Sequence, residues 1–212
     1  MIYENVGAIS DLNLTVILEV GIVLATFVGG FTIGLKKMPK FKPSPQKDKN
    51  YWKLHSNIHE VLTELRIKTG CARSQAIQFH NGEYFMDGVC MRMKTLTHES
   101  IARGVQGEGR IKQRLQLSMF VPLMEIITKN TPDVHLIETC EESYCKQFME
   151  SSNVVSFAVL PLKKAGMITG YIMCQWCSVQ KTKSLKKSIV EEELTKARDM
   201  IEVHINQQKA GN

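Results

Sequence analysis

The stretch VVSFAVLPLKKAGMITGYIMCQW, residues 154–176, decides the fold more than any other part of this sequence. Two apolar runs, 154–162 and 167–176, stand on either side of the tetrapeptide KKAG. Runs of this length and composition form strands, and a short connection that contains Gly joins two strands into a hairpin. We therefore expect an antiparallel hairpin in the last third of the chain.

Weaker patterns before and after this hairpin predict the other elements. Apolar side chains three and four positions apart indicate helices, alternation indicates strands, and a Thr139–Glu142 capping box opens a helix. The expected elements, in chain order, are a helix from 51 to Gly70, strands over 72–79 and 88–97, a loop over 104–114, a helix over 115–129, a short strand over 134–137, a helix to 150, the hairpin, and a last helix to 208.

This order predicts an α/β fold of the α+β kind. We expect a central, mostly antiparallel sheet of five or six strands with the terminal helices packed on one face. The middle loops and helices must then cover the other face, an arrangement that tends to leave a pocket between sheet and loops.

The N-terminal part of the chain predicts a membrane anchor. Residues 12–35 are predominantly apolar and carry a single charge, Glu19. A run of this length can form one transmembrane helix. A signal peptide is the rival reading, but acidic rather than basic residues precede the run. The lysines follow the run, so the positive-inside rule predicts a single-pass protein with residues 1–11 outside and the C-terminal domain in the cytoplasm.

Two features of this region predict its contacts. Small residues at four-residue spacing allow two membrane helices to approach and form a dimer, although Gly is common in such helices anyway; they are Gly21, Ala25, Gly29, Gly30 and Gly34. Residues 36–50 form a basic linker with three prolines. Its lysines should lie near anionic lipid headgroups, whether as a stop-transfer flank or a lipid sensor; those nearest the helix are Lys36, Lys37, Lys40 and Lys42.

The motif QFHNGEYFMDG, residues 78–88, is the candidate site of the cytoplasmic domain. Asn and Gly tolerate a positive φ, so the motif can be only a turn. The alternative is that its polar and aromatic side chains form the lip of a ligand pocket, in which a His can titrate near neutral pH. The candidate lip residues are His80, Asn81, Tyr84, Phe85, Asp87 and Arg92.

The FHNG segment at 79–82, the FMDG turn at 85–88 and the closing hairpin PLKKAGMITGYI at 161–172 resemble those of a GAF domain, a PAS-related sensory fold. The resemblance covers about residues 51–209, which we take as one domain. It implies a module that binds a small molecule or tetrapyrrole, or that dimerises and transmits a signal. Nothing in the sequence identifies a cofactor.

The six cysteines leave an enzymatic alternative open. Some GAF-fold proteins reduce free methionine sulfoxide with cysteines, so the resemblance implies Cys71, Cys90, Cys140 and Cys145 as candidates. Cys174 and Cys177 are three apart in a predicted strand and point to opposite faces, which is poor geometry for a metal site, and we expect none. The net charge of +6 is concentrated in the linker, so we expect no nucleic acid partner.

The main hypothesis is a membrane-anchored, self-associating GAF-like module that binds a small ligand or a protein partner. An enzyme is less favoured. A membrane scaffold or assembly factor with a filled pocket is the third reading.

Overall fold

The computed structural model describes residues 45–207, and the side chains within this range except at its two ends. The chain divides into two compact units, Met1–Lys47 and Asp48–Asn212, and the fold described here is that of the second. The predicted transmembrane helix, its small-residue motif and the lysines at 36–42 lie outside the described residues.

Six strands form one sheet in the order β3-β2-β1-β6-β5-β4, and every neighbouring pair is antiparallel. The prediction of a mostly antiparallel, five- or six-stranded sheet is therefore confirmed. The strands are β1 (Arg73–Tyr84), β2 (Cys90–Ile101), β3 (Leu115–Gln116), β4 (Val134–Leu136), β5 (Ser156–Lys164) and β6 (Met167–Trp176). The helices are α2 (Pro45–Thr69), α3 (Val121–Lys129), α4 (Tyr144–Ser151), α5 (Val179–Lys183) and α6 (Lys187–Gln207), with 3-10 turns η1 (Leu117–Phe120) and η2 (Ile137–Thr139).

The hairpin predicted from residues 154–176 is present as β5 and β6. Its turn consists of Ala165 and Gly166, both with positive φ (50° and 79°). Two consecutive residues in this conformation match the right-handed twist of the flanking strands, which is why such turns close hairpins. The β6 strand also passes unusually close to β1 at Gly170. A Cβ at this position would lie 2.2 Å from the carbonyl oxygen of Ile77, so only glycine fits there.

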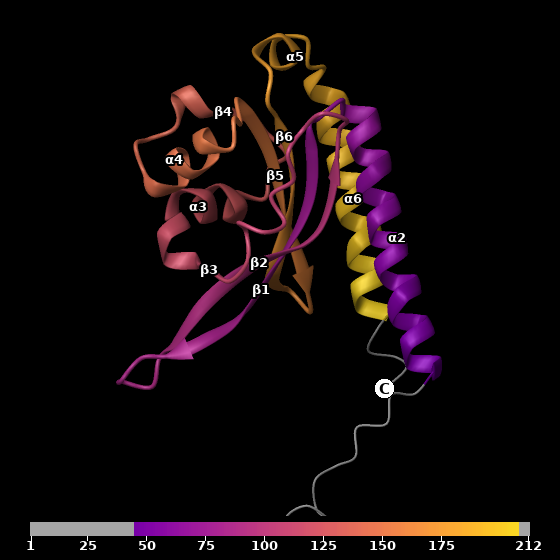
Figure 1. The fold of residues 1–212 in the computed structure, drawn as a ribbon, viewed down its shortest axis with the longest axis vertical. Helices are drawn as coiled ribbons and strands as arrows, with labels where there is room; N and C mark the ends of the chain where they lie inside the picture. The colour runs from indigo at the N-terminus through magenta and orange to yellow at the C-terminus, as the bar shows by residue number, and fades with distance from the viewer. Residues whose placement is uncertain (1–44, 208–212) are drawn as a thin grey trace, which may run out of the picture. The chain divides into compact units, whose positions relative to one another are not determined.

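The two faces of the sheet are covered by different helices (Figure 1). The terminal helices α2 and α6 lie side by side on one face, where Leu62, Leu65, Trp176 and Leu194 are among the buried side chains of one apolar cluster. The other face is covered by α3, α4 and η2 over a second cluster. We call these the α2–α6 face and the α3–α4 face. The predicted layering is therefore confirmed.

The first hairpin differs from its prediction. The strand β1 does not end at Phe79 but continues to Tyr84, and the register with β2 shifts between Asn81 and Tyr84. The Asn81–Gly82 pair therefore lies in a β-bulge and not in a turn. At this bulge a Cβ on Gly82 would meet Met93 Cγ at 2.6 Å and the Met91 carbonyl oxygen at 2.9 Å. The reversal of the chain comes later, at residues 85–89.

Three other boundaries were also predicted wrongly, and one short helix was missed. The helix expected over 115–129 begins only at Val121, after β3 and η1, because Pro122 fits the first turn of a helix and not its interior. The helix α4 is capped by Ser143, whose hydroxyl accepts from the Lys146 N–H at 3.2 Å, and not by Thr139. The helix α5 was missed, and α2 begins at Pro45, six residues before the predicted start.

Candidate functional site

The α3–α4 face carries polar side chains in its interior. Strand alternation places Arg73 and Gln75 of β1 on the same face as Ile77, and Gln175 of β6 on the same face as Tyr171. All three polar residues are buried. Buried polar groups must be hydrogen-bonded to be tolerated, so the segment above these strands has to supply partners.

The segment between β2 and β3, together with Glu99 near the end of β2, supplies partners for Arg73 and Gln75, and Arg73 in turn donates from Nη1 to Gln175 Oε1 at 3.2 Å. Lys112 donates from Nζ to Glu108 Oε2 at 2.5 Å and to Gln75 Oε1 at 3.0 Å. The Gln75 side-chain amide donates to Glu108 Oε2 at 2.5 Å and to Glu99 Oε1 at 2.7 Å. Arg73 donates from Nε to the Gln106 carbonyl at 2.8 Å. These bonds hold the β2–β3 segment down on the sheet.

Glu108 is the centre of this network. Burial would raise the pKa of its carboxyl group, but the charge of Lys112 and its hydrogen bonds outweigh burial and hold the pKa below its usual value. Among the described residues its second oxygen, Oε1, accepts no hydrogen bond, and it lies 3.9 Å from the Arg73 guanidinium. The network therefore keeps an ionised carboxylate inside the domain.

A second buried cation lies further along the same face. Lys94 Nζ donates to the Tyr171 hydroxyl at 3.2 Å and lies 3.2 Å from the centre of the Phe120 ring. Burial, together with the nearby charge of Lys112, lowers the pKa of Lys94 to about 7. An aromatic face attracts a cation, so the ring partly replaces the water that Lys94 has lost.

Next to this region a cavity of about 230 Å³ lies between α3, η2, α4 and the inner side of β5. Its walls are largely apolar and include Ile126, Phe157 and Met149. Its polar lining comes from one imidazole, one amine, two carboxylates, two hydroxyls and two thiols, those of His135, Lys146, Glu125, Glu141, Thr139, Ser143, Cys140 and Cys145. Apolar walls with a few convergent polar groups are typical of a small-molecule site.

His135 is the most informative of these groups. Its ring stacks on Phe157 with 5.3 Å between ring centres, and its Nε2 is shielded from solvent yet has no hydrogen-bond partner among the described residues. Burial lowers the pKa of His135, which favours the neutral ring. A buried ring nitrogen without a partner is a site that a ligand could satisfy.

The cysteines of this cavity are not activated. Burial raises the pKa of both Cys140 and Cys145 above the ordinary value of a thiol. The thiolate, and not the thiol, is the nucleophile, so neither side chain is primed to attack a sulfoxide. The other two candidates lie elsewhere, since Cys71 is buried on the α2–α6 face and Cys90 is on the β1–β2 hairpin. The structure therefore brings together two of the four.

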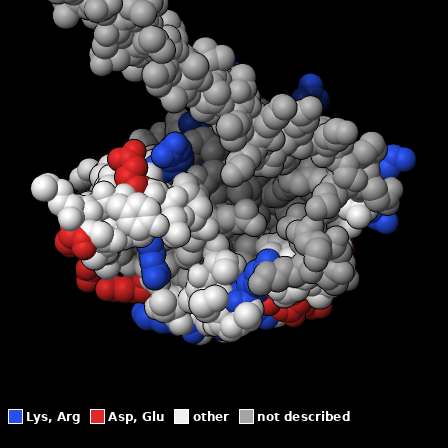
Figure 2. All heavy atoms as spheres, turned by 90° about the horizontal axis from the view of Figure 1, so that it is seen from below, with Lys and Arg blue, Asp and Glu red and all other residues white. Residues whose placement is uncertain are grey.

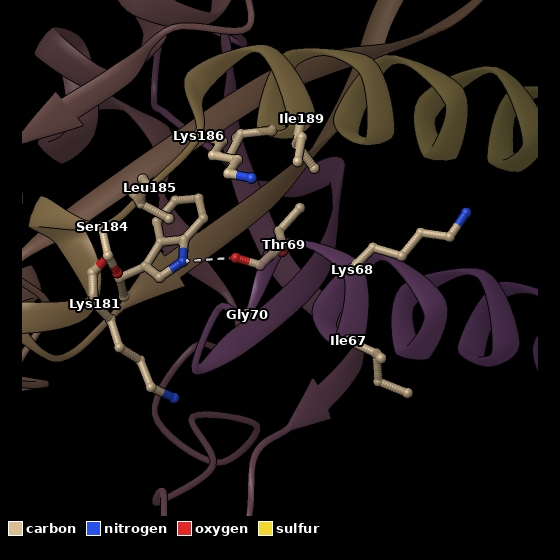
Figure 3. Close-up of a pocket in the computed structure, with 11 residues that line it drawn as sticks. Ile67, Lys68, Thr69, Gly70, Lys181, Ser184, Leu185, Lys186 and Ile189 are labelled. Carbon is tan, nitrogen blue, oxygen red and sulfur yellow. Dashed lines mark hydrogen bonds between the residues drawn. The ribbon is translucent and has the colours of Figure 1, made fainter.

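A larger hollow of about 410 Å³ lies where the end of α2 meets α5 and the start of α6 (Figure 3). Trp176 is one of its lining residues, and its Nε1 donates to the Thr69 carbonyl at 3.3 Å. Lys68 on its rim is paired with Glu64 and Glu193 at 2.7 and 3.1 Å. These polar groups are satisfied within the fold, and we therefore favour the smaller cavity as the site.

The six residues predicted to form the lip of a pocket do not lie at either cavity. All six residues lie on the outer part of the β1–β2 hairpin and are exposed, and none lines either cavity. His80 bonds to the Thr95 hydroxyl at 2.8 Å, and Asp87 Oδ1 accepts from the Val89 N–H at 2.9 Å. Their role in ligand binding stays a prediction. The alternation of β2 and the Glu108–Lys112 spacing were the signals that could have revealed the buried charges.

Within residues 45–207 no helix is long and apolar enough to cross a membrane. In the same part of the chain, no three side chains of His, Cys, Asp or Glu converge in a way that could hold a metal ion.

Several solved structures resemble this one. The GAF domain of PixJ from Thermosynechococcus elongatus, in its blue-light absorbing form, has a TM-score of 0.51 at 12% identity, over 76% of this chain and 92% of that one. The phycoerythrobilin-bound and phycocyanobilin-bound GAF domains from a cyanobacterial phytochrome have TM-scores of 0.51 and 0.51 at 13% and 14% identity, each over 79% of this chain and 98% of the other. The chain has the fold of a GAF domain. No protein-family model and no curated protein matches its sequence.

The GAF fold agrees with the resemblance found in the sequence. At identities this low the likeness shows the fold alone, and the bound bilins belong to those proteins.

Proposed function

We propose that this protein is a membrane-anchored GAF-like sensory module that binds a small, largely apolar ligand in the cavity between α3, η2, α4 and β5. The observation that carries the proposal is the cavity itself, which is bordered by His135, a ring whose shielded Nε2 has no hydrogen-bond partner among the described residues. The ligand would be neutral at this point and would offer one hydrogen-bonding group to the ring.

The size of the cavity limits the ligand. About 230 Å³ is less than the roughly 300–1,000 Å³ of common ligand pockets. A four-ring bilin would require a rearrangement of α3 or α4. A compact molecule fits the cavity better, and the two protonated thiols would contribute to its apolar contacts.

The anchor and self-association are parts of the same proposal. The apolar segment 12–35 supports a single transmembrane helix, and the lysines after it support a cytoplasmic domain. The small residues from Gly21 to Gly34 support pairing of two such helices. A ligand that changes the packing of α3 or α4 could then alter the dimer.

Native mass spectrometry of the full chain, released from detergent micelles, tests the ligand. We expect a small molecule that leaves on denaturation, and we expect His135→Phe to lose it because the ring keeps its stacking but not its nitrogen. His59→Phe, on the exposed side of α2, is the matched control and should keep the ligand.

A wild-type chain without any bound molecule, whether purified from its own cells or after incubation with a cell extract, would contradict a ligand-binding role. Equal retention by His135→Phe and wild type would leave a ligand but move its site away from this cavity.

A further inference from the structure

The outer end of the β1–β2 hairpin exposes large apolar side chains. At this tip, residues 84–89, Tyr84 is 69% exposed and Phe85 52%, and Met86 is fully exposed. Val89 beside them is 57% exposed. Single exposed apolar residues are ordinary, but four within six positions form a patch that needs an explanation.

The tip is held in shape by its own hydrogen bonds. The Phe85 N–H donates to the Val89 carbonyl at 2.9 Å, and the Gly88 N–H donates to the Phe85 carbonyl at 2.9 Å. Asp87 accepts from the Val89 N–H, and Gly88 takes the positive φ of 81° that the turn requires. The apolar side chains are therefore presented to the outside by an ordered turn.

A second group of exposed aromatic residues lies at the start of α2. Trp52 is 67% exposed, and the ring of Tyr51 lies against those of Trp52 and His55, with ring centres 5.3 and 4.0 Å apart. In Figure 1 the start of α2 and the hairpin tip both lie at the lower end of the domain. At the upper end, by α5, the exposed apolar side chains are aliphatic, such as Ile67 and Val179.

Figure 2 views the domain from this lower end. Uncharged surface is prominent among the described residues, and basic and acidic side chains are scattered around it without a broad field of one sign. The chain also enters the domain here, because residues 12–35 and the four lysines of 36–42 precede α2, whose first turns carry Lys47 and Lys49. A chain anchored by residues 12–35 therefore has the start of α2 close to the bilayer.

We propose that the hairpin tip, together with Tyr51 and Trp52, is a second membrane contact that inserts its aromatic and Met side chains into the bilayer interface. Tyr and Trp are favoured at this depth, where the ring is buried among lipid and its polar atom stays hydrated. Two contacts on different elements fix the orientation of the domain, which one flexible tether cannot do. This inference depends on the membrane anchor of the proposed function.

The acidic charges at the hairpin tip imply that the tip binds lipid through its apolar side chains and not through attraction to anionic headgroups. Glu83 and Asp87 flank the exposed side chains, so anionic lipid would repel this part of the surface. Binding of the tip should therefore occur on a neutral bilayer and should be insensitive to salt. A basic patch attracted to anionic headgroups would show the opposite behaviour.

Tryptophan quenching in nanodiscs tests this contact. The full chain is placed in phosphatidylcholine nanodiscs with and without lipids that carry a nitroxide quencher at the interface. The variant Met86→Trp is made in a Trp52→Phe background, which leaves the fully buried Trp176 as the only other tryptophan. The matched control is Val179→Trp in the same background, at the opposite end of the domain.

We expect quencher lipid to reduce the fluorescence of the probe at position 86 by about twofold or more, as for a side chain within the interface, and to leave the probe at 179 unchanged. The unmodified chain adds a second readout, since Trp52 should be quenched and Trp52→Phe should remove that quenching. Near-ultraviolet circular dichroism checks that each variant is folded.

Each other outcome overturns the inference. Equal quenching at 86 and 179 would mean that the domain has no fixed orientation. No quenching at 86 in a chain that withstands alkaline extraction would leave the anchor in place and reject the tip contact. A chain removed by alkaline extraction would reject the anchor as well. A blue shift at 86 that depends on protein concentration and not on lipid would assign the tip to contact between copies.

Discussion

The two faces of the sheet are both buried, but they are built differently. The α2–α6 face is packed mainly with aliphatic side chains, two cysteines and Trp176, and it also holds the His55–His98 pair, in which His55 Nε2 has no hydrogen-bond partner among the described residues. The α3–α4 face holds two buried lysines, an ionised Glu108 and a cavity with an unpartnered ring nitrogen. Apolar packing dominates the first face, whereas the second face combines an apolar cluster with buried charged groups and a cavity.

The largest expected effect comes from breaking the buried network. Glu108→Ala leaves Lys112 buried without its carboxylate, and we expect a loss of about 3–5 kcal/mol in the free energy of unfolding. Urea denaturation of the full chain in detergent measures it. The matched control is Glu142→Ala, whose partner Lys146 lies at the same distance of 2.5 Å but whose carboxylate is 74% exposed; about 0–1 kcal/mol is expected there. A similar loss for both would mean that the network is not desolvated.

A substitution that creates a cavity in the α2–α6 face should lower the free energy of unfolding by a comparable but somewhat smaller amount. Leu194 is fully buried in the core of α6, and Leu194→Ala should lower the free energy of unfolding by about 2–5 kcal/mol. Ligand binding should persist in the folded fraction, because the cavity lies across the sheet. Val203→Ala, an exposed position on the same helix, should change stability by less than about 0.5 kcal/mol. Loss of the ligand in folded Leu194→Ala would contradict the claim that the α2–α6 core and the ligand cavity are independent of each other.

Lys94 makes stability rise with pH on the α3–α4 face. Its folded pKa of about 7 lies below the ordinary value near 10.4, so between these pH values the unfolded chain holds a proton that the folded chain lacks. Stability should therefore increase from pH 7 to pH 9, by at most about 1.4 kcal/mol per pH unit. Lys94→Met should be more stable than wild type at pH 7 and should lose this slope. Lys183→Met, on the exposed α5, should keep the wild-type slope.

The smallest expected effect is a loss of stability at acidic pH, and it comes from a pair of histidines on the α2–α6 face. His55 Nδ1 and His98 Nε2 lie 2.7 Å apart, and burial with the charges of His55 and His59 lowers the pKa of His98 to about 4. As the pH falls from 6.5 towards 4, the unfolded chain gains a proton that folded His98 does not accept, so stability should decrease.

Thermal melts between pH 4 and pH 7 would detect this loss. His98→Gln should flatten the dependence, whereas His204→Gln, in the last turn of α6, should not. An unchanged profile in His98→Gln would place the acid sensitivity elsewhere.

Local patterns in the sequence predicted most of the fold but not the site. The β5–β6 hairpin, the terminal helices and the antiparallel sheet could be predicted because apolar periodicity and the Ala165–Gly166 turn are local signals. The first hairpin was misjudged because Asn81–Gly82 suits a bulge as well as a turn, and only the close packing against Met93 distinguishes the two.

The element order, the layers of the domain and the apolar and basic character of the N-terminal segment could be predicted from residues 1–212 alone, because each depends on neighbouring residues. Only the tertiary structure decided that Gln75, Glu108 and Lys112 meet inside the domain and that His135 borders a cavity. It also decided that the candidate lip residues of 80–92 lie on an exposed hairpin. These outcomes depend on contacts between residues far apart in the chain, where strand register and helix docking set the distances.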